Sequence, residues 1–420
     1  MKVCVIGNGG REHALAWRLS ISPSVTKVYA IPGSAAMSDC AELVGIDWQQ
    51  SDHLISFLKD NHVDLVVVGP EAPLVAGLAD TLNKAGIPVF GPSKAAAQLE
   101  GSKVFAKDLM KKYNIPTAAY GVFHKVDEAK EFIAQTGAPI VVKADGLAAG
   151  KGVVVAMTIE EANAAVEDML SGNRFGDAGS TVVIEEFMEG EEASLLAFVD
   201  GKTVVPMIAS QDHKRIFDGD KGPNTGGMGT YAPAPVLTDA LRDEAMKTIL
   251  EPMVAAMEKE GMPYVGCLYA GLMITPQGPK VVEFNARFGD PETQVVLPLL
   301  DSDLGQIMMA CATGTLTADM VKWKDSSAAC VILASKGYPE ISSKGDVLHG
   351  DIKQHDTTIV FHSGTKLVGD EYVTNGGRVL GVVGLGKDLR TALDRAYGRI
   401  EHIDFEGMQY RTDIGAKAFK

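Results

Sequence analysis

The residues with the clearest chemical potential lie in segment 281–294 (VVEFNARFGDPETQ). In a strand, every second side chain points to the same face, so Glu283, Asn285 and Arg287 are predicted to share one face. Carboxylate and amide oxygens suit a hard divalent cation such as Mg²⁺ or Mn²⁺, and a guanidinium can grip a phosphoryl group through two parallel hydrogen bonds. The polar outer face of an edge strand is the alternative, but the turn that follows at 288–291 favours a metal–phosphate site.

A second candidate phosphate site is the glycine-rich stretch 143–152 (KADGLAAGKG), which lies between two apolar segments. It is not a P-loop, because its spacing is one residue short and Gly152 stands where that motif needs Ser or Thr. Lysines at both ends of a flexible stretch suit a flap that closes over a triphosphate; an ordinary hairpin with a solvated lysine is the alternative. Lys143 favours the flap, because it ends an apolar strand where an unpaired cation would be costly.

Three other polar segments could position a ligand. The turn at 7–10 (GNGG) joins a strand to a helix, where backbone N–H groups can bind an anion. Glu12 replaces the third glycine of a dinucleotide fingerprint, which favours a small phosphorylated ligand over NAD, with a plain tight turn as the alternative. The acidic run 185–192 is either a solvated face or a hinge that binds adenine. The loop 211–231 is long enough to favour a substrate-binding role over simple flexibility.

Short apolar runs alternate with helical patterns in the first hundred residues, which predicts a parallel sheet covered on both faces. The expected strands there are 3–7, 27–30, 64–69 and 87–90, and the expected helices are 11–20 and 73–84. Beyond a break at 91–93, helices are expected at 94–100, 102–112, 158–171, 238–260 and 387–401, and strands at 139–143, 153–156, 181–184, 194–199, 264–275, 280–286, 328–335, 357–361 and 378–383. In the last module, 326–420, no residue gives an independent signal of function.

Composition narrows the class of protein. The 420 residues carry 39 Lys and Arg against 54 Asp and Glu, a net charge of −15, which argues against general nucleic-acid or anionic-membrane binding. Five cysteines without zinc-site spacing indicate free thiols in a reducing cytosol. Because there is no signal-peptide pattern and no apolar run of about 18 residues, a cytoplasmic protein is expected. No long exposed apolar stripe is evident, which favours a monomer.

Five strings together resemble the ATP-grasp ligases and, among them, the glycinamide ribonucleotide synthetases. They are GNGGREHALAW at 7–17, GPSKAAAQLEGSK at 91–103, KADGLAAGKGV at 143–153, QDHKRIFDGDKGPNTGGMGTY at 211–231 and RFGDPETQ at 287–294. The resemblance extends over residues 1–415. The last two strings are specific to this family of ligases.

The resemblance implies an α/β fold in three parts. These are an N-terminal parallel-sheet, Rossmann-like domain at 1–101, a central ATP-grasp domain at 102–320 with a mobile lid at 120–190, and a small C-terminal α+β domain at 326–420. It also implies ATP-dependent ligation of glycine to 5-phosphoribosylamine in purine biosynthesis. The reaction would pass through a glycyl-phosphate intermediate and release ADP and phosphate, with Mg²⁺ or Mn²⁺ as the cofactor and ATP as a co-substrate.

The same resemblance implies roles for individual residues. The ATP-binding set is Lys103, Lys143, Gly150, Lys151, Gly152, Glu185, Glu186, Phe187, Met188 and Glu192, the last of which would hold the ribose hydroxyls. The metal ligands would be Glu283 and Asn285, and the catalytic residues Arg287 and Asp290. The substrate-binding set is Gly9, Gly10, Glu71, Asp212, Lys214, Asn224, Thr225, Gly226, Gly227, Gly289, Pro291 and Glu292. One departure is that the strand at 269–275 holds no acidic residue, so only two metal ligands can be named.

Two alternative functions stay open. One is another ATP-grasp carboxylate–amine ligase or carboxylase of purine metabolism, and a carboxylase would turn over ATP in a bicarbonate-dependent way. The other is a nucleotide-binding regulatory module without turnover. Such a module would be expected to have lost Glu283, Asn285 or Arg287, and all three are present.

Overall fold

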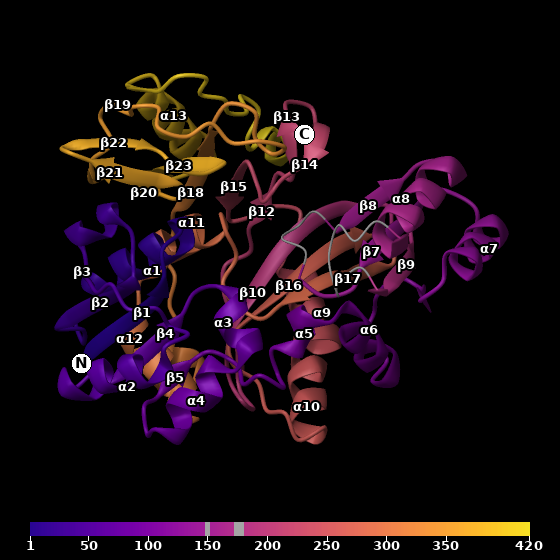
Figure 1. Ribbon diagram of the computed structural model, residues 1–420, viewed down its shortest axis with the longest axis horizontal. Helices are drawn as coiled ribbons and strands as arrows, with labels where there is room; N and C mark the ends of the chain where they lie inside the picture. Colours follow the sequence, from indigo (N-terminus) through magenta and orange to yellow (C-terminus); the bar gives the residue numbers. More distant parts are fainter. Residues whose placement is uncertain (148–151, 172–179) are drawn as a thin grey trace.

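Figure 1 shows the computed structural model, which describes residues 1–147, 152–171 and 180–420. The indigo N-terminal elements lie beside the yellow C-terminal elements, and a group of magenta strands and helices projects at the opposite end of the long axis. None of the helices in the described part of the chain is long and apolar enough to cross a membrane. All five cysteines are free thiols.

The first sheet is parallel and buried on both faces. It consists of β1 (Lys2–Gly7), β2 (Lys27–Pro32), β3 (Glu42–Leu43), β4 (Leu65–Val68) and β5 (Val89–Phe90), in the order β3-β2-β1-β4-β5. Val5 packs into one core, with α1 (Gly10–Ser20), and its neighbours Cys4 and Ile6 pack into the other, with α2 (Ser51–Asp60). The predicted parallel sheet is confirmed, and the glycine-rich turn follows directly after its central strand.

The prediction of one continuous helix at 73–84 is wrong. The chain forms α3 (Glu71–Ala76) and α4 (Leu78–Lys84), separated by Gly77 at φ +95°. Glycine adopts this left-handed conformation without the steric cost of a side chain, and it therefore commonly ends a helix. The break leaves Glu71 in the first turn of its own short helix, directly beyond the end of β4.

Two short helices lead out of the N-terminal part. These are α5 (Gln98–Gly101) and α6 (Lys103–Lys112). The hydroxyl of Ser102 caps α6 by accepting a hydrogen bond from the N–H of Phe105 (3.1 Å). The expectation of a helix from residue 94 is wrong, because residues 94–97 form turns before α5 begins.

The projecting part is an antiparallel sheet backed by two helices. Its elements are β6 (Tyr120–Phe123), α7 (Val126–Thr136), β7 (Ile140–Ala144), β8 (Val153–Ala156), α8 (Ile159–Ser171) and β9 (Val182–Glu186), with strand order β6-β9-β7-β8. Side chains fix the start of α8: Thr158 Oγ1 accepts a hydrogen bond from the N–H of Glu161 (3.2 Å), and the Glu161 carboxylate accepts one from the N–H of Met157 (2.7 Å).

A second central sheet carries the predicted metal ligands. It contains β10 (Glu191–Asp200), β11 (Val204–Pro206), β16 (Val265–Thr275) and β17 (Gly278–Asn285), in the order β11-β10-β16-β17. A continuous helix lies beside this sheet, as predicted. It consists of α9 (Asp239–Ala245), a π-helical turn at Met246–Leu250 and α10 (Glu251–Lys259). The segment after β17 leads into α11 (Thr293–Val296) and α12 (Leu304–Thr313).

The segment 211–231, expected to be a loop, forms strands. They are β12 (Gln211–Asp212), β13 (Arg215–Phe217), β14 (Lys221–Asn224) and β15 (Gly229–Ala232). β13 and β14 pair as a hairpin, whereas β15 pairs with β18 (Ser327–Ala334), almost 100 residues later. These strands are two to four residues long and lack a hydrophobic alternation, so local pattern does not reveal them. β15 also depends on a partner strand that is distant in the sequence.

The C-terminal sheet therefore includes strands from two parts of the chain. Its order is β12-β15-β18-β23-β20, with β20 (Thr358–His362), β23 (Arg378–Gly386) and the covering helix α13 (Leu389–Ile400). Two small ribbons complete this part: β19 (His349–Gly350) with β24 (Ile403–Asp404), and β21 (Thr365–Val368) with β22 (Glu371–Thr374). This arrangement attaches the polar segment 211–228 to the C-terminal part of the protein.

A buried histidine pair joins the N-terminal part to the C-terminal sheet. The backbone N–H of His362, on β20, donates to Nδ1 of His13, on α1 (3.0 Å). This bond requires Nδ1 to carry no proton, so the His13 ring is neutral. Burial, together with the neighbouring His362, lowers the pKa of His13 to about 3, and burial lowers the pKa of His362 to about 4.

Acidification below pH 6.5 is therefore expected to destabilise the protein. In the unfolded chain, histidines take up protons near a pKa of about 6.5, whereas His13 and His362 resist protonation in the folded state. The free energy of unfolding therefore decreases as the pH falls from about 6.5 towards the folded-state pKa values of these two residues. Each histidine contributes at most about 1.4 kcal/mol per pH unit. Replacing His13 by asparagine, whose side-chain oxygen can accept the same hydrogen bond, should reduce the pH dependence of the urea-unfolding free energy. An unchanged dependence would contradict this account.

Candidate active site

The two predicted metal ligands lie at the end of β17, the edge strand of its sheet. Glu283 is opposite Gly271 and Asn285 is opposite Tyr269, so both side chains point to the same face. The side-chain amide of Asn285 donates to Glu283 Oε1 (3.4 Å). A bulge at Val282 interrupts the ladder just before Glu283. The sheet thus presents a carboxylate and an amide side by side at its rim.

Three lysines act on the Glu283 carboxylate. Burial alone would raise its pKa, but Lys214, Lys143 and Lys103 outweigh burial and hold the pKa of Glu283 below its usual value. An ionised carboxylate beside an amide is the kind of oxygen donor set that Mg²⁺ takes, with substrate phosphates and water as its other ligands. The residues present therefore fit a divalent cation. The described residues contain no cluster of three or more His, Cys, Asp or Glu side chains that could hold a metal.

A buried ion-pair cluster centred on Glu185 lies beside this site. The Glu185 carboxylate is 3.0 Å from Lys143 Nζ and 3.3 Å from Lys107 Nζ, and all three side chains are almost fully buried. Burial lowers the pKa of Lys107 to about 8, although Glu185 opposes the shift. Lys107 is absent from the predicted set, yet its position one helical turn after Lys103 was an available signal. Lys103 itself donates to the carbonyl of Gly146 (2.9 Å), where the glycine-rich stretch begins.

The glycine-rich stretch connects β7 to β8. The N–H of Ala144 donates to the carbonyl of Gly152 (2.8 Å), which closes the base of the connection. Gly152 is buried there, whereas the predicted ATP contacts Gly150 and Lys151 lie outside the described residues.

The predicted adenine hinge lies where β9 leaves its sheet. Glu186 is the last residue of β9, and the half-buried Phe187 and Met188 follow it, beyond the ladder. Glu192, the second residue of β10, lines the same pocket as Glu283. The hinge thus lies at the end of the projecting sheet, whereas Glu192 and the metal-ligand pair lie on β10 and β17 of the second central sheet.

Arg287 does not share the strand face predicted for it, because β17 ends at Asn285 and the chain turns. Its guanidinium pairs instead with Glu100 (2.8 Å) and Glu71 (3.2 Å), and lies 3.5 Å from the Asn285 side-chain oxygen. These carboxylates outweigh burial and raise the pKa of Arg287 above its usual value. Arg287 is thus oriented by carboxylates, one of which, Glu100, is absent from the predicted set.

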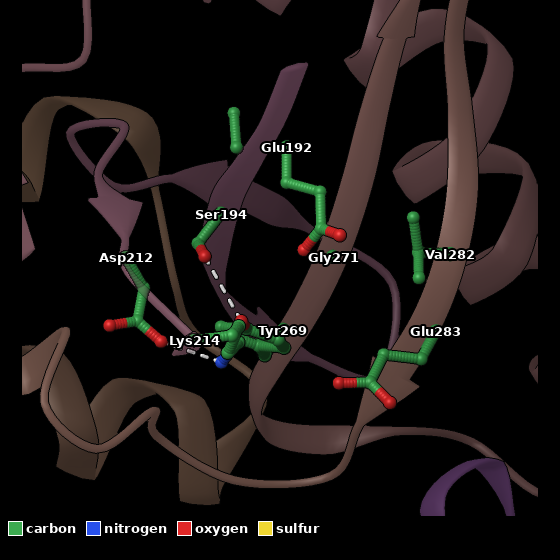
Figure 2. Close-up of a pocket in the computed structure, with 9 residues that line it drawn as sticks. Glu192, Ser194, Asp212, Lys214, Tyr269, Gly271, Val282 and Glu283 are labelled. Carbon is green, nitrogen blue, oxygen red and sulfur yellow. Dashed lines mark hydrogen bonds and ion pairs between the residues drawn. The ribbon is translucent and has the colours of Figure 1, made fainter. Parts of the chain in front are cut away.

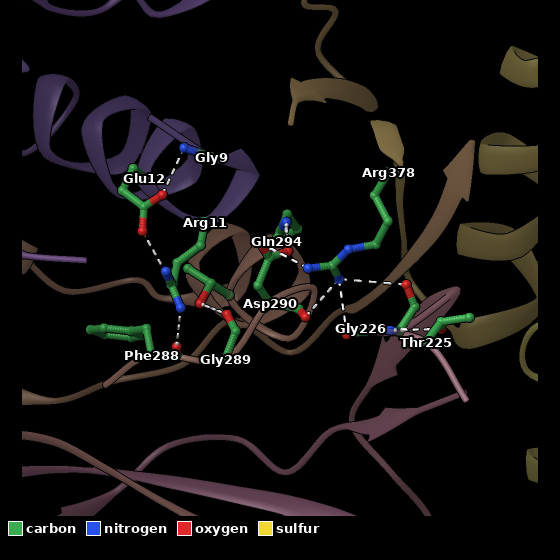
Figure 3. Close-up of polar contacts among 12 residues, drawn as sticks. Gly9, Arg11, Glu12, Thr225, Gly226, Phe288, Gly289, Asp290, Gln294 and Arg378 are labelled. Atoms are coloured by element: carbon green, nitrogen blue, oxygen red, sulfur yellow. Dashed lines mark hydrogen bonds and ion pairs between the residues drawn. The ribbon is translucent and has the colours of Figure 1, made fainter. Parts of the chain in front are cut away.

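Arg378 ties together two of the predicted substrate segments (Figure 3). Its guanidinium donates to the carbonyl oxygens of Asp290 (2.8 Å) and Gly226 (2.9 Å), and it lies 3.5 Å from the Asp290 carboxylate. The arginine offsets the effect of burial and holds the pKa of Asp290 below its usual value. Arg378 thus connects the module 326–420 to two of the predicted substrate segments. No motif marks Arg378, because its partners are 88 and 152 residues away in the sequence.

The glycine-rich turn after β1 is closed by a carboxylate from its own helix. Glu12 accepts a hydrogen bond from the N–H of Gly9 (2.7 Å), forms an ion pair with Arg11, and packs against Gly7 and Gly69 (Figure 3). A negative side chain here complements the positive end of α1.

Gly10 lies where all three parts of the chain meet. A Cβ at this position would collide with Oγ of Ser363 from the C-terminal part and would lie 3.0 Å from Nε2 of Gln294. Gln294 in turn donates to the Asp290 carboxylate (2.8 Å). Glycine at position 10 is thus required by a close approach, and this approach brings the helix start to the 287–292 turn.

A small pocket lies between β10, β12 and the β16–β17 face (Figure 2). It is lined by Glu192, Ala193, Ser194, Asp212, Lys214, Tyr269, Gly271, Val282 and Glu283. The hydroxyls of Ser194 and Tyr269 both contact Glu292 Oε1, at 3.2 and 2.9 Å. Ser194 and Tyr269 are absent from the predicted set. Their signal was a polar group placed inside an otherwise apolar strand.

The hydroxyl of Thr225 orders the segment 224–229. Thr225 donates from its hydroxyl to the carbonyl of Lys214 (2.8 Å) and accepts from the N–H of Gly227 (3.0 Å). Asn224 ends β14, opposite Arg215. These bonds hold the glycines of the segment against the 287–292 turn.

Replacing Gly227 by alanine is expected to lower kcat/KM about 10- to 100-fold, because strained backbone costs about 1–3 kcal/mol. Gly227 has φ +121°, and a Cβ there would lie 2.6 Å from Pro291 Cδ and 2.8 Å from both Asp212 oxygens. The matched control is Gly45→Ala, because a Cβ at Gly45 meets nothing within 4 Å. Steady-state kinetics would reveal the difference, and equal activity of both variants would contradict the close packing inferred here.

Comparisons with known proteins agree along the whole chain. The N domain, the ATP-grasp (A) domain and the C domain of phosphoribosylglycinamide synthetase match residues 1–100, 101–293 and 328–417. The phosphoribosylamine–glycine ligase of Halalkalibacterium halodurans is 53% identical over 418 residues, covering 100% of this chain and 97% of that protein. That of Escherichia coli O157:H7 is 52% identical over 425 residues, covering 100% and 99%.

Solved structures give the same result. The crystal structure of phosphoribosylamine–glycine ligase from Thermotoga maritima superposes with a TM-score of 0.86 at 34% identity, covering 99% of this chain and 100% of that one. The biotin carboxylase domain of Hydrogenobacter thermophilus 2-oxoglutarate carboxylase shares the fold, with a TM-score of 0.75 at 17% identity, covering 97% and 91%. The three-part α/β fold class predicted from sequence is confirmed. The chain belongs to the phosphoribosylglycinamide synthetase family, whose central domain is an ATP-grasp domain.

Proposed function

We propose that this protein is the ATP-dependent ligase that joins glycine to 5-phosphoribosylamine in purine biosynthesis. The products would be glycinamide ribonucleotide, ADP and phosphate. The observation that carries the proposal is the pocket in which Glu283, Lys214 and Asp212 meet beside Lys103 and Lys143. This pocket offers positive charge for phosphates and opposite charges for an amino acid, within a chain that matches such ligases over its full length.

The first step is phosphorylation of glycine. A carboxylate oxygen attacks the γ-phosphorus of ATP, the bond to the bridging oxygen breaks, and ADP leaves with glycyl phosphate formed. Such a transfer needs positioning and charge neutralisation more than covalent help from the protein. Lys103 and Lys143 would supply positive charge to the phosphates. A divalent cation, Mg²⁺ or Mn²⁺, held by Glu283 and Asn285 would supply further charge neutralisation there.

The second step is formation of the amide. The neutral amine of phosphoribosylamine attacks the acyl carbon, the nitrogen loses a proton, and phosphate leaves with the oxygen that glycine contributed. Asp290, held by Arg378, lies on the turn that would face this reaction. Gly9, Gly10 and Glu71 would line the phosphoribosylamine side, and Arg287 would complete the anion-binding surface between the two substrates.

The nucleotide would lie between the central sheet and the projecting sheet. The backbone at 186–188 would pair with the adenine ring, Glu192 would accept hydrogen bonds from the ribose hydroxyls, and the 146–152 stretch would close over the phosphates. We further propose that the protein works in the cytoplasm as a monomer, with small-molecule substrates and without nucleic-acid or membrane partners.

Measurement of ADP release with each substrate omitted in turn tests this function. Turnover should require ATP, glycine and freshly prepared phosphoribosylamine together. Turnover that continues without glycine would overturn the proposal. Bicarbonate in place of glycine is the matched control, because stimulation by bicarbonate would identify a carboxylase instead.

A further inference from the structure

The last residues of the chain bind the tip of the β13–β14 hairpin. We call residues 411–417 the tail and residues 218–220 the hairpin tip, and Figure 1 marks the C-terminus beside these strands. The Arg411 side chain is 1% exposed. Its guanidinium donates to the Asp220 carboxylate (2.8 Å) and to the carbonyl of Arg215 (3.1 Å). A buried arginine of the tail therefore binds both the tip and the first strand of the hairpin.

Carboxylates on both sides of this contact accept further hydrogen bonds. Asp413 receives two parallel hydrogen bonds from Arg411 (2.7 and 2.8 Å) and also accepts one from the N–H of Gly219 (2.9 Å). In the other direction, the Asp218 carboxylate accepts hydrogen bonds from the N–H (2.8 Å) and the hydroxyl of Thr412. The tail and the hairpin tip therefore each donate to a carboxylate of the other, and bonds to charged groups are the stronger kind.

The tail is itself held by α13. The hydroxyl of Tyr397 donates to the carbonyl of Arg411 (2.8 Å) and accepts from the N–H of Ile414 (3.1 Å), which is buried in the core. Lys417 adds a second cation, 2.8 Å from Asp220. Burial would raise the pKa of Asp220, but Lys417 and Arg411 hold this pKa below its usual value. The tail is therefore a fixed support that faces an ionised carboxylate at the hairpin tip.

The hairpin has few other contacts to hold its tip. Within the described part of the chain, β13 and β14 pair only with each other, and an isolated two-stranded hairpin is marginally stable in water. Ile216 is the one buried residue among 215–224, all of which the structure describes, and its neighbour Phe217 is 55% exposed. Hydrogen bonds and ion pairs from the tail are therefore the main restraint on the tip.

The base of the hairpin carries a predicted substrate segment. The carbonyl of Lys214, the residue before β13, accepts hydrogen bonds from the N–H (2.7 Å) and the hydroxyl (2.8 Å) of Thr225, the residue after β14. The hydroxyl of Thr225 in turn accepts from the N–H of Gly227 (3.0 Å). Because the first two bonds cross from one side of the hairpin to the other, their alignment depends on the pairing of the two strands.

Building on the proposed function, we propose that Arg411, Asp220 and Asp413 form an ionic latch that positions segment 214–227 for substrate binding. Arg411 does not line the pocket and acts through the hairpin, so it is a positioning residue. When the latch opens, the two sides of the hairpin base lose their alignment. Substrates bind only the latched form, so their apparent affinity falls with the fraction of molecules that are latched. Saturating substrate restores the latched form, and kcat is then unchanged.

Arg411→Met tests the latch through the split between KM and kcat, because methionine keeps an unbranched apolar stem and removes the guanidinium. The KM values for glycine and phosphoribosylamine should rise at least about tenfold, the effect of losing hydrogen bonds from a charged group. We expect kcat to change less than about twofold and the KM for ATP less than about threefold, because the latch acts on the substrate segment alone. A folding defect would instead lower kcat by reducing the amount of active enzyme. Unchanged KM values for glycine and phosphoribosylamine, or an equal rise in the KM for ATP, would overturn the latch.

Asp220→Asn tests the latch without disturbing the core. Asp220 is an exposed residue at φ +55°, a conformation that asparagine readily adopts. The amide hydrogens of Gly219 and Thr412 donate across the contact, so their exchange with solvent should become at least about tenfold faster when the charge is lost. The matched control is Asp370→Asn, because Asp370 is an exposed carboxylate in the turn of another short hairpin, β21–β22. Unchanged exchange in Asp220→Asn, or an equal increase in the control, would overturn the latch.

Wild-type protein gives an independent check even if Arg411→Met fails to fold. The N–H of Gly219 donates from the hairpin tip to the tail, and that of Thr412 donates from the tail to the tip. A latch that opens as one unit should therefore give both amides the same free energy of opening in hydrogen exchange. Exchange at Gly219 while Thr412 stays protected would overturn the latch. Absence of glycine-dependent turnover in the wild type would instead overturn the proposed function, and the exchange rates decide on the latch in either case.

Discussion

Replacing Glu283 by glutamine is expected to lower kcat at least about 1000-fold while the fold stays intact. Glutamine has the same shape but no charge, so it removes the ionised oxygen around which Lys214, Lys143 and Lys103 are arranged. It also removes the proposed metal ligand beside Asn285. The measurement is glycine-dependent ADP release at saturating ATP and Mg²⁺, with circular dichroism as the test of folding.

The matched control for this substitution is Glu244→Gln. Glu244 is exposed and lies beside Gly278, at the opposite end of the same β16–β17 hairpin. It should leave kcat unchanged. Near-normal activity of the Glu283 variant at low Mg²⁺ would show that the metal assignment is wrong.

Replacing Arg378 by alanine is expected to lower kcat/KM at least about 100-fold, since it removes charged hydrogen bonds that hold two substrate segments together. Without the guanidinium, the carbonyls of Gly226 and Asp290 lose their shared donor, and the Asp290 carboxylate loses its cation. The loss should fall on the KM values for glycine and phosphoribosylamine. The affinity for ATP, measured by equilibrium binding, should change little, because the proposed nucleotide contacts lie on other strands.

Chemical rescue separates this positioning role from a general loss of stability. Added guanidinium ion at low concentration should restore part of the activity of Arg378→Ala, whereas it should have no such effect on Arg395→Ala. Arg395 is an exposed arginine on α13 that donates to the carbonyl of Leu385. Equal losses in the two variants, or a loss of ATP affinity in Arg378→Ala, would contradict the account.

The local sequence predicts those elements whose signal is local. The apolar runs that form β1 and β4, alternating with helical patterns, lead directly to a parallel sheet. By contrast, β15 is a strand only because β18 pairs with it from almost 100 residues away. Short strands of this kind carry no periodicity, so the segment around them resembles a loop.

The candidate site shows the same division. Motifs identify which segments carry chemistry, and the structure brings Glu283, Asn285, Lys143 and Lys214 into one neighbourhood. Which side chains become partners depends on the folded chain. The ion pair between Arg287 and Glu100 and the hydrogen bond from Arg378 to the carbonyl of Gly226 therefore could not be predicted from spacing in the sequence. The roles assigned to individual site residues remain predictions that the substitutions above test.

Glycine labelled with ¹⁸O in its carboxylate gives the most direct test of ligation through an acyl phosphate. One carboxylate oxygen attacks phosphorus in the first step and leaves with phosphate in the second. The account therefore predicts one labelled oxygen in the inorganic phosphate released per turnover, with the other retained in the amide product. Glycine-dependent turnover that releases only unlabelled phosphate would contradict it.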